Sequence, residues 1–155
     1  MGTTVFTGPV VSGDKFAGDA NGPNLGYSLL EQQLQIPQAG AGNTDYTLYV
    51  PAGSIFLGFD VDVLTAFNSA TSATLSIGTA AGGTQYVTGV DCKAATGRIA
   101  ITYTAAQLAA MNGISILGVA APAPANVNIR MATVGATTAG FVNLTVRYAQ
   151  LTSSN

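Results

Sequence analysis

The segment 54–65 alternates between two sets of side chains, and this period of two limits what the chain can fold into. One set is Ile55, Leu57, Phe59, Val61 and Val63, and the other is Phe56, Gly58, Asp60, Asp62 and Leu64. Alternation over this length predicts a half-buried β-strand, because successive side chains of a strand point to opposite faces. We expect the first set to face a core. The second set places Asp60 and Asp62 in solvent or at a contact.

Several other segments have strand-like patterns bounded by turn residues. The expected strands are 26–36, 46–50, 73–77, 85–90, 98–103, 114–119, 126–134 and 142–148. The last two are expected to pair as an antiparallel hairpin with Arg130 and Arg147 on its polar face. Many short strands separated by turns predict an all-β fold, a single antiparallel β-sandwich with jelly-roll-like topology.

One short helix is expected near 104–111. Thr104 and Gln107 have the spacing of a capping box, in which each side chain bonds a backbone amide at the start of the helix. Asn112 and Gly113 are typical of a helix end.

The first 24 residues are too rich in helix and strand breakers to form either element. Gly8-Pro9, Gly13, Gly18 and Asn21-Gly22-Pro23 interrupt them. We interpret residues 1–24 as an extended N-terminal arm and residues 25–155 as the sandwich domain. The arm is either a frayed terminus or a segment that docks on a neighbouring subunit. In the second case its apolar residues are the candidate partner-binding residues: Val5, Phe6, Val10, Val11 and Phe16.

The chain carries very little charge. Only 8% of its residues are charged, whereas ordinary soluble proteins have roughly 25%. A weakly charged surface suits a protein packed against copies of itself or against a partner. A neutral secreted bacterial domain is the alternative.

Charge and hydropathy also bear on nucleic acids and membranes. The net charge is −2 and the basic residues are spread along the chain, so we expect no nucleic-acid binding. No secretory signal is readable and no apolar run approaches the ~20 residues of a membrane span. We therefore expect no membrane partner, and a soluble product made in a cytoplasm.

The chain lacks the usual catalytic groups. It has no histidine, which excludes Ser/His/Asp and Cys/His nucleophile systems. Its single cysteine, Cys92, lies between Asp91 and Lys93 and is interpreted as a small buried hydrophobe, with an interchain bridge as the alternative. We expect no enzyme activity, no catalytic residues, no cofactor and no metal.

Two polar features could still bind or react. Asp60 and Asp62 lie on one strand face about 7 Å apart at the backbone, which fits a solvated face, a Ca²⁺ contact or a glycosidase pair, although the chain has no tryptophan. A sugar-binding shelf could be built from the six tyrosines, yet the strand phase places Tyr103 and Tyr148 with core residues.

Five segments resemble small virion proteins of tailed phages that infect proteobacteria. They are residues 24–27, 65–86, 89–91, 104–111 and 139–148, so the resemblance extends over most of the length of the chain. It implies a structural virion protein, and for β-sandwich proteins of this class the best-understood role is capsid decoration, or cement. A decoration protein would bind the major capsid protein on the capsid surface as a homo-oligomer, for which a trimer is expected. The family defines no catalytic residues.

Two other functions fit the same sequence. One is a tail, neck or head-fibre subunit, which the same composition would serve. The other is a carbohydrate-binding module that recognises host glycans, and this function requires solvent-facing tyrosines gathered on one side.

Overall fold

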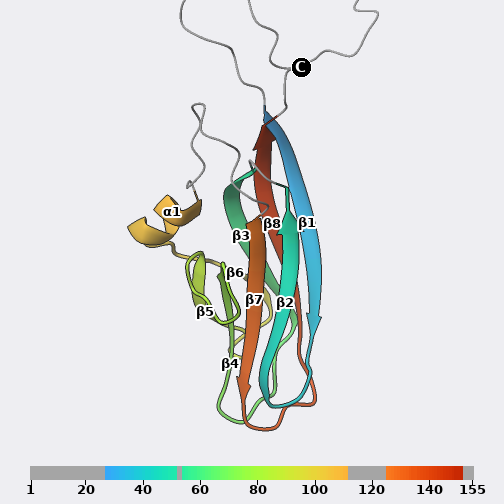
Figure 1. Ribbon diagram of the computed structural model, residues 1–155. Coiled ribbons are helices and arrows are strands. Elements are labelled where there is room, and N and C mark those ends of the chain that lie inside the picture. Colours follow the sequence, from blue (N-terminus) through green and yellow to red (C-terminus); the bar gives the residue numbers. More distant parts are fainter. Residues whose placement is uncertain (1–26, 52–53, 112–124, 152–155) are drawn as a thin grey trace, which may run out of the picture.

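The chain folds as two antiparallel four-stranded sheets packed face to face (Figure 1). The computed structural model describes residues 27–51, 54–111 and 125–151. Within these ranges the elements are β1 (Tyr27–Pro37), β2 (Gly42–Val50), β3 (Ser54–Thr65), β4 (Ser72–Gly78), β5 (Val87–Asp91), β6 (Gly97–Ile99), α1 (Ala105–Met111), β7 (Ala125–Val134) and β8 (Phe141–Leu151). The predicted all-β antiparallel sandwich with one short helix is confirmed.

Early and late strands of the chain are neighbours in both sheets. Sheet A has the order β1-β8-β3-β6 and sheet B the order β2-β7-β4-β5. Jelly rolls also interleave early and late strands in this way. The predicted hairpin of β7 and β8 is wrong, because β7 pairs with β2 and β4 whereas β8 pairs with β1 and β3. Arg130 and Arg147 therefore lie on opposite outer faces of the sandwich.

The core lies between the sheets and takes alternate residues from the long strands. Ile36, Val61 and Leu144 of sheet A meet Leu75, Ile77 and Ile129 of sheet B, and all six are fully buried. The predicted inward-facing residues of the last two strands are buried as expected: Val127, Ile129, Met131, Thr133, Val142, Leu144, Val146 and Tyr148. Alternation therefore predicted the faces of β7 and β8 correctly, although it did not predict their pairing.

A β-bulge changes the phase of β3. Phe56 pairs with Tyr148 and Gly58 with Arg147, which leaves Leu57 as an extra residue. Phe56 and Phe59 consequently both face the core, at 5% and 2% exposure, whereas Leu57 is 53% exposed. The prediction that Leu57 faces the core is wrong, and the bulge is the reason.

The bulge also assembles an aromatic cluster. With Phe56 and Phe59 on the same side of β3, the ring of Tyr86 packs against both, at centroid distances of 5.0 and 5.7 Å.

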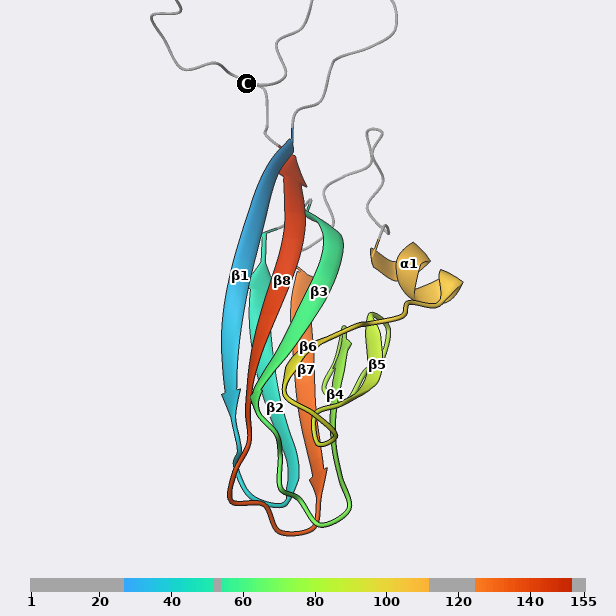
Figure 2. The same ribbon diagram turned by 180° about the vertical axis from the view of Figure 1, so that it is seen from behind.

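The predicted strand 98–103 is shorter in the structure, where β6 ends at Ile99. Residues 100–103 leave the sheet as the chain turns toward α1 (Figure 2). Tyr103 keeps one link to β3, because its hydroxyl accepts from the Phe59 N–H at 3.0 Å and donates to the Phe59 carbonyl at 3.2 Å. The predicted strand 114–119 lies outside the described residues.

The predicted capping box of α1 is present. The Gln107 N–H donates to Thr104 Oγ1 at 3.2 Å, and the Thr104 N–H donates to Gln107 Oε1 at 2.9 Å. Gln107 Nε2 also donates to Thr88 Oγ1 at 3.0 Å, while Met111 packs into the core at 4% exposure. These contacts anchor the helix beside β5.

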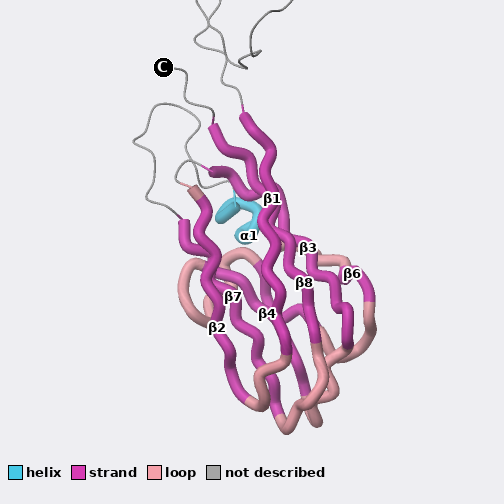
Figure 3. The backbone as a smooth tube through the Cα atoms, turned by 90° about the vertical axis from the view of Figure 1, so that its right-hand side faces the viewer, coloured by secondary structure: helices cyan, strands magenta, loops and turns pink. Residues whose placement is uncertain are grey.

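The two ends of the sandwich differ. At one end, here called the terminal end, β1 begins, β3 begins and β8 ends, since Tyr27 pairs with Leu151 and Ser54 with Gln150. At the opposite end, the loop end, lie the connections from β1 to β2, from β3 to β4 and from β7 to β8 (Figure 3). Asn68 holds two of these loops together, because its Oδ1 accepts from Thr137 Oγ1 and from the N–H groups of Thr138 and Ala139, all at 2.9–3.0 Å.

Candidate functional site

The outer face of sheet A carries a cluster of four charged residues. The Asp60 carboxylate pairs with two arginines. Arg147 Nε and Nη2 lie 3.0 and 3.2 Å from its two oxygens, and Arg98 Nη2 lies 3.2 Å from one of them. Arg98 reaches Asp62 as well, at 3.7 Å. The cluster joins β3, β6 and β8, strands that are distant in the sequence, and it leaves the Asp60 side chain only 15% exposed.

This geometry decides between the functions considered for the two carboxylates. Both oxygens of Asp60 accept from arginine, so the countercharge that a calcium ion would supply is already present. Within the described ranges no group of three or more His, Cys, Asp or Glu side chains could hold a metal ion. The cluster therefore fits the paired polar face of a strand better than a metal site or a glycosidase pair.

A groove runs across the same face nearer the terminal end. It consists of two adjoining hollows of about 480 and 390 Å³ that share Leu57 and Arg147. Leu29 and Glu31 of β1 line one hollow, and Asp60, Ile101 and Tyr103 line the other. Leu29 and Leu57 are 74% and 53% exposed. We call this feature the outer groove. Exposed leucines line it next to the cluster of paired arginines and aspartates.

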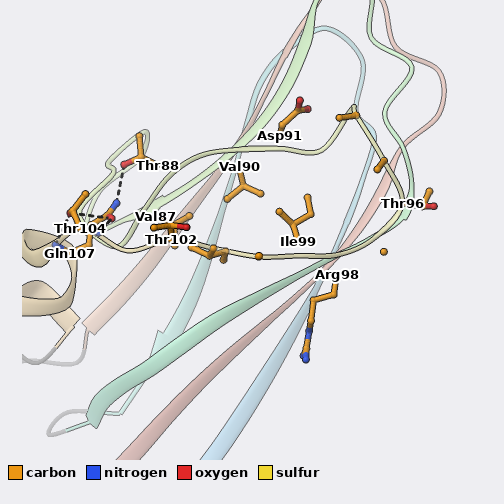
Figure 4. Close-up of a pocket in the computed structure, with 15 residues that line it drawn as sticks. Val87, Thr88, Val90, Asp91, Thr96, Arg98, Ile99, Thr102, Thr104 and Gln107 are labelled. Atoms are coloured by element: carbon orange, nitrogen blue, oxygen red, sulfur yellow. Dashed lines mark hydrogen bonds between the residues drawn. The ribbon is translucent and has the colours of Figure 1, made fainter.

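A third hollow of about 670 Å³ lies between β5 and residues 94–104, where the edges of the two sheets do not close on each other. Val90 and Ile99 point toward each other across it, whereas Arg98 points away (Figure 4). Its lining is mainly aliphatic and threonine side chains, with Asp91 as its acidic group. This lining does not bring together an acid, a base and a nucleophile.

The second outer face, that of sheet B, is mostly uncharged. Its one described ion pair joins Arg130 and Asp45, with Nε and Nη2 each 2.7 Å from a carboxylate oxygen. The bonds from Arg130 lower the pKa of Asp45. Around this pair the outward-facing positions carry threonine and asparagine, such as Thr47 and Asn128, which bond each other at 3.2 Å.

Cys92 is a buried hydrophobe, as predicted. Its side chain is fully buried, and this burial, together with the nearby Asp91 carboxylate, raises the pKa of the thiol to about 12. A thiol with such a pKa is neutral at physiological pH and a poor nucleophile. An interchain bridge does not fit a sulfur with no exposed surface.

The tyrosines do not form a shelf on the described surface. Tyr86 and Tyr148 are buried, Tyr46 and Tyr103 are half-buried, and Tyr49 is 69% exposed. Burial raises the pKa of Tyr86 and of Tyr103. Tyr148, predicted to lie in the core, is bonded there by Gln32 Nε2 at 2.9 Å. A carbohydrate-binding face needs several exposed rings together, so the structure does not support this function.

The candidate arm residues Val5, Phe6, Val10, Val11 and Phe16 lie outside the described residues. The exposed residues of the outer groove were not identified from the sequence. One sign was available, because Leu29 is in phase with Glu31, Gln33 and Gln35. A large apolar residue on an otherwise polar strand face is typical of a contact surface.

Comparison with known proteins supports the fold. No protein-family model matches the chain, and no curated protein matches it. Among solved structures it is similar to a chain of the cyanophage Pam1 capsid asymmetric unit, with a TM-score of 0.50 and 18% sequence identity. The match covers 94% of this chain and 99% of that chain. At this identity the likeness concerns the fold alone, and it extends over nearly the full length of both chains.

The described ranges contain no candidate membrane-spanning helix. None of the helical residues there forms a segment that is both long and apolar enough to cross a bilayer.

Proposed function

We propose that the protein is a structural component of a tailed-phage virion, and specifically a decoration, or cement, protein of the capsid surface. The observation that carries this proposal is the nearly full-length likeness to a chain of a phage capsid asymmetric unit. The sequence resemblance to small virion proteins points the same way. The described surface also fits, since its arginines Arg98, Arg130 and Arg147 are all paired with aspartates of the same chain.

The proposed mechanism is mechanical. Copies of the protein, expected to be trimers, sit at junctions between major capsid subunits and add buried area that resists internal pressure. An ordinary interface buries roughly 1,600 Å², and repetition over many copies stabilises the shell without any single strong bond. This function needs no catalytic residue and no cofactor.

Copy number in purified virions tests the proposal. Quantitative mass spectrometry is expected to find on the order of hundreds of copies per particle, because decoration repeats with the capsid lattice. Cryo-electron microscopy of the same particles should place them on the head. A dozen copies or fewer at a neck, tail or fibre would contradict decoration while keeping a virion role, and absence from particles would contradict both.

The arm supplies a second test. Deletion of residues 1–24 is expected to abolish binding to capsids that lack the protein, because the arm is proposed to reach across a subunit boundary and order there. Co-sedimentation with capsids measures binding, and circular dichroism checks that the sandwich remains folded. A full-length variant shows whether the apolar side chains of the arm are responsible. It should lose binding too when the candidate residues are changed to serine: Val5, Phe6, Val10, Val11 and Phe16. Unimpaired binding by the deleted chain would overturn the role of the arm.

A further inference from the structure

The outer groove is open at its β3 end because sheet A is incomplete there. Strand β6 pairs with β3 only at Val61, Asp62 and Val63. From Ser54 to Asp60 no strand among the described residues pairs with β3 on that side, and the Tyr103 hydroxyl binds the backbone of Phe59 instead. The hollow of about 390 Å³ beside Leu57 results from this gap.

The groove has the size of a short extended peptide. It passes from β1 over β8 to β3 and on to residues 98–103. Neighbouring strands are about 4.8 Å apart, so three such steps cover roughly 15 Å, the length of four or five extended residues. The bulge deepens the path, because Gly58 has no side chain and lies between Leu57 and the ion cluster.

The lining favours an occupant with apolar side chains and no acidic group. Leu29 and Leu57 offer apolar contact on both sides of Arg147, whose charge is met by Asp60. An acidic peptide would have to displace an aspartate to reach an arginine, and it would face the Glu31 carboxylate, which has no ion pair among the described residues.

Two parts of the chain outside the described residues have this chemistry. One is residues 112–124, which contain Ile114, Ile116 and Leu117 and are joined at both ends to α1 and β7, and the other is the arm. Residues 3–12 carry no charge and contain Val5, Phe6, Val10 and Val11. Residues 17–26, which are near enough to Tyr27 to fold back onto their own groove, contain Leu25 as their one large apolar residue.

We infer that the outer groove of one copy binds the four or five arm residues around Val5 and Phe6 of a second copy, with these two side chains against Leu29 and Leu57. Phe6 precedes Tyr27 by about twenty residues, which span roughly 70 Å when extended. Strand β1 has 11 residues and a length of roughly 36 Å. The arm is therefore long enough to carry Phe6 past its own sandwich to a neighbour.

This contact joins two different surfaces, so it is heterologous. Heterologous contacts that close give rings, as the expected trimer requires. The inference rests on the proposed function in one respect, since it identifies the neighbouring subunit on which the arm docks. A ring binds a capsid through several copies at once, and this multivalency explains why loss of the arm would also weaken capsid binding.

Two matched substitutions in the full-length chain test the inference. Leu57→Arg puts a charge into the groove, whereas Leu64→Arg changes a leucine of the same strand that is 58% exposed and does not line the groove. By sedimentation equilibrium the wild type is expected to be oligomeric at micromolar concentration. Leu57→Arg should raise the dissociation constant about 30-fold, in line with loss of one leucine contact, and Leu64→Arg should leave it unchanged. A monomeric wild type, or equal behaviour of the two variants, would overturn the inference.

Cross-linking identifies the occupant. Two chains, one with Phe6→Cys and the other with Leu57→Cys, are mixed under a mild oxidant, and a mixed disulfide dimer is the expected product. If the bond forms only within a chain that carries both substitutions, the arm fills its own groove and the inference is wrong. Residues 112–124 are the competing occupant, so the inference is equally wrong if Leu57→Cys bonds instead to Ile116→Cys of that segment. These measurements use no capsid, so their outcome is independent of whether the protein is found on virions.

Discussion

Replacement of Phe59 by alanine is expected to lower the free energy of unfolding by about 3–5 kcal/mol, the usual cost of removing a buried phenylalanine. Phe59 is 2% exposed and its ring packs on Phe56 and Tyr86, both 5.7 Å away between centroids. These rings fill the space between the sheets, so the cavity cannot close by a small shift. Since small domains have a total stability of about 5–15 kcal/mol, the loss would be a large share of it.

Urea unfolding followed by circular dichroism measures this effect. Leu57→Ala is the matched control, because Leu57 is two residues away on the same strand and 53% exposed. It is expected to cost less than about 1 kcal/mol. If Leu57→Ala were as damaging as Phe59→Ala, the phase of β3 on either side of the bulge would be different from the one described.

Replacement of Gly140 by alanine is expected to destabilise the protein by about 3 kcal/mol, through backbone strain and overpacking together. Gly140 has a φ of 153°, and a Cβ there would lie 2.5 Å from the ring of Phe67. Phe67 is 2% exposed and cannot easily move, because its N–H donates to the Cys92 carbonyl at 3.1 Å.

Gly58 provides the control for this variant. Its φ is 155°, nearly that of Gly140, but a Cβ there would meet its nearest neighbour, Arg147 Nη2, at an ordinary 3.6 Å. Gly58→Ala should therefore cost only the backbone strain, roughly 1 kcal/mol at the lower end of the usual cost of an unfavourable backbone conformation. Thermal unfolding of both variants separates the two contributions, and an equal loss in both would show that the contact with Phe67 is unimportant.

The sequence predicted local structure well where a single pattern determines it. The bounds of β3, the capping box at Thr104 and the inward faces of β7 and β8 are confirmed. The phase of β3 before Gly58 was not predictable, because Ile55, Phe56 and Leu57 are all apolar and either phase satisfies the alternation. Only the pairing with β8 shows that one residue is extra.

Pairing between strands was the other limit. Residues 126–134 and 142–148 are adjacent, alternate well and are separated by a glycine-bounded turn, all of which favours a hairpin. In the sandwich this turn crosses from sheet B to sheet A instead. Both strands bury one face in either arrangement, so the periodicity is the same and carries no information on the partner.

Beyond the single sign given by Leu29, the outer groove could not have been predicted, for the same reason. Leu29, Leu57 and Arg147 come from three strands, and they meet only because β8 lies between β1 and β3. The sequence does show the low charge and the apolar residues of the arm, which led to the prediction of an assembly module. The surface on which a neighbouring copy is proposed to bind depends on the order of strands in sheet A.

The internal pairing of Arg98, Arg130 and Arg147 has a consequence for how copies meet. Proteins with complementary fields attract one another over distance and associate at up to 10⁸–10⁹ M⁻¹s⁻¹, a rate that falls with ionic strength. When the described arginines are already paired with aspartates, the surface exerts little long-range electrostatic attraction on another copy. Its encounters would proceed at the roughly 10⁵–10⁶ M⁻¹s⁻¹ of uncharged partners, governed by how many copies are present rather than by the salt around them.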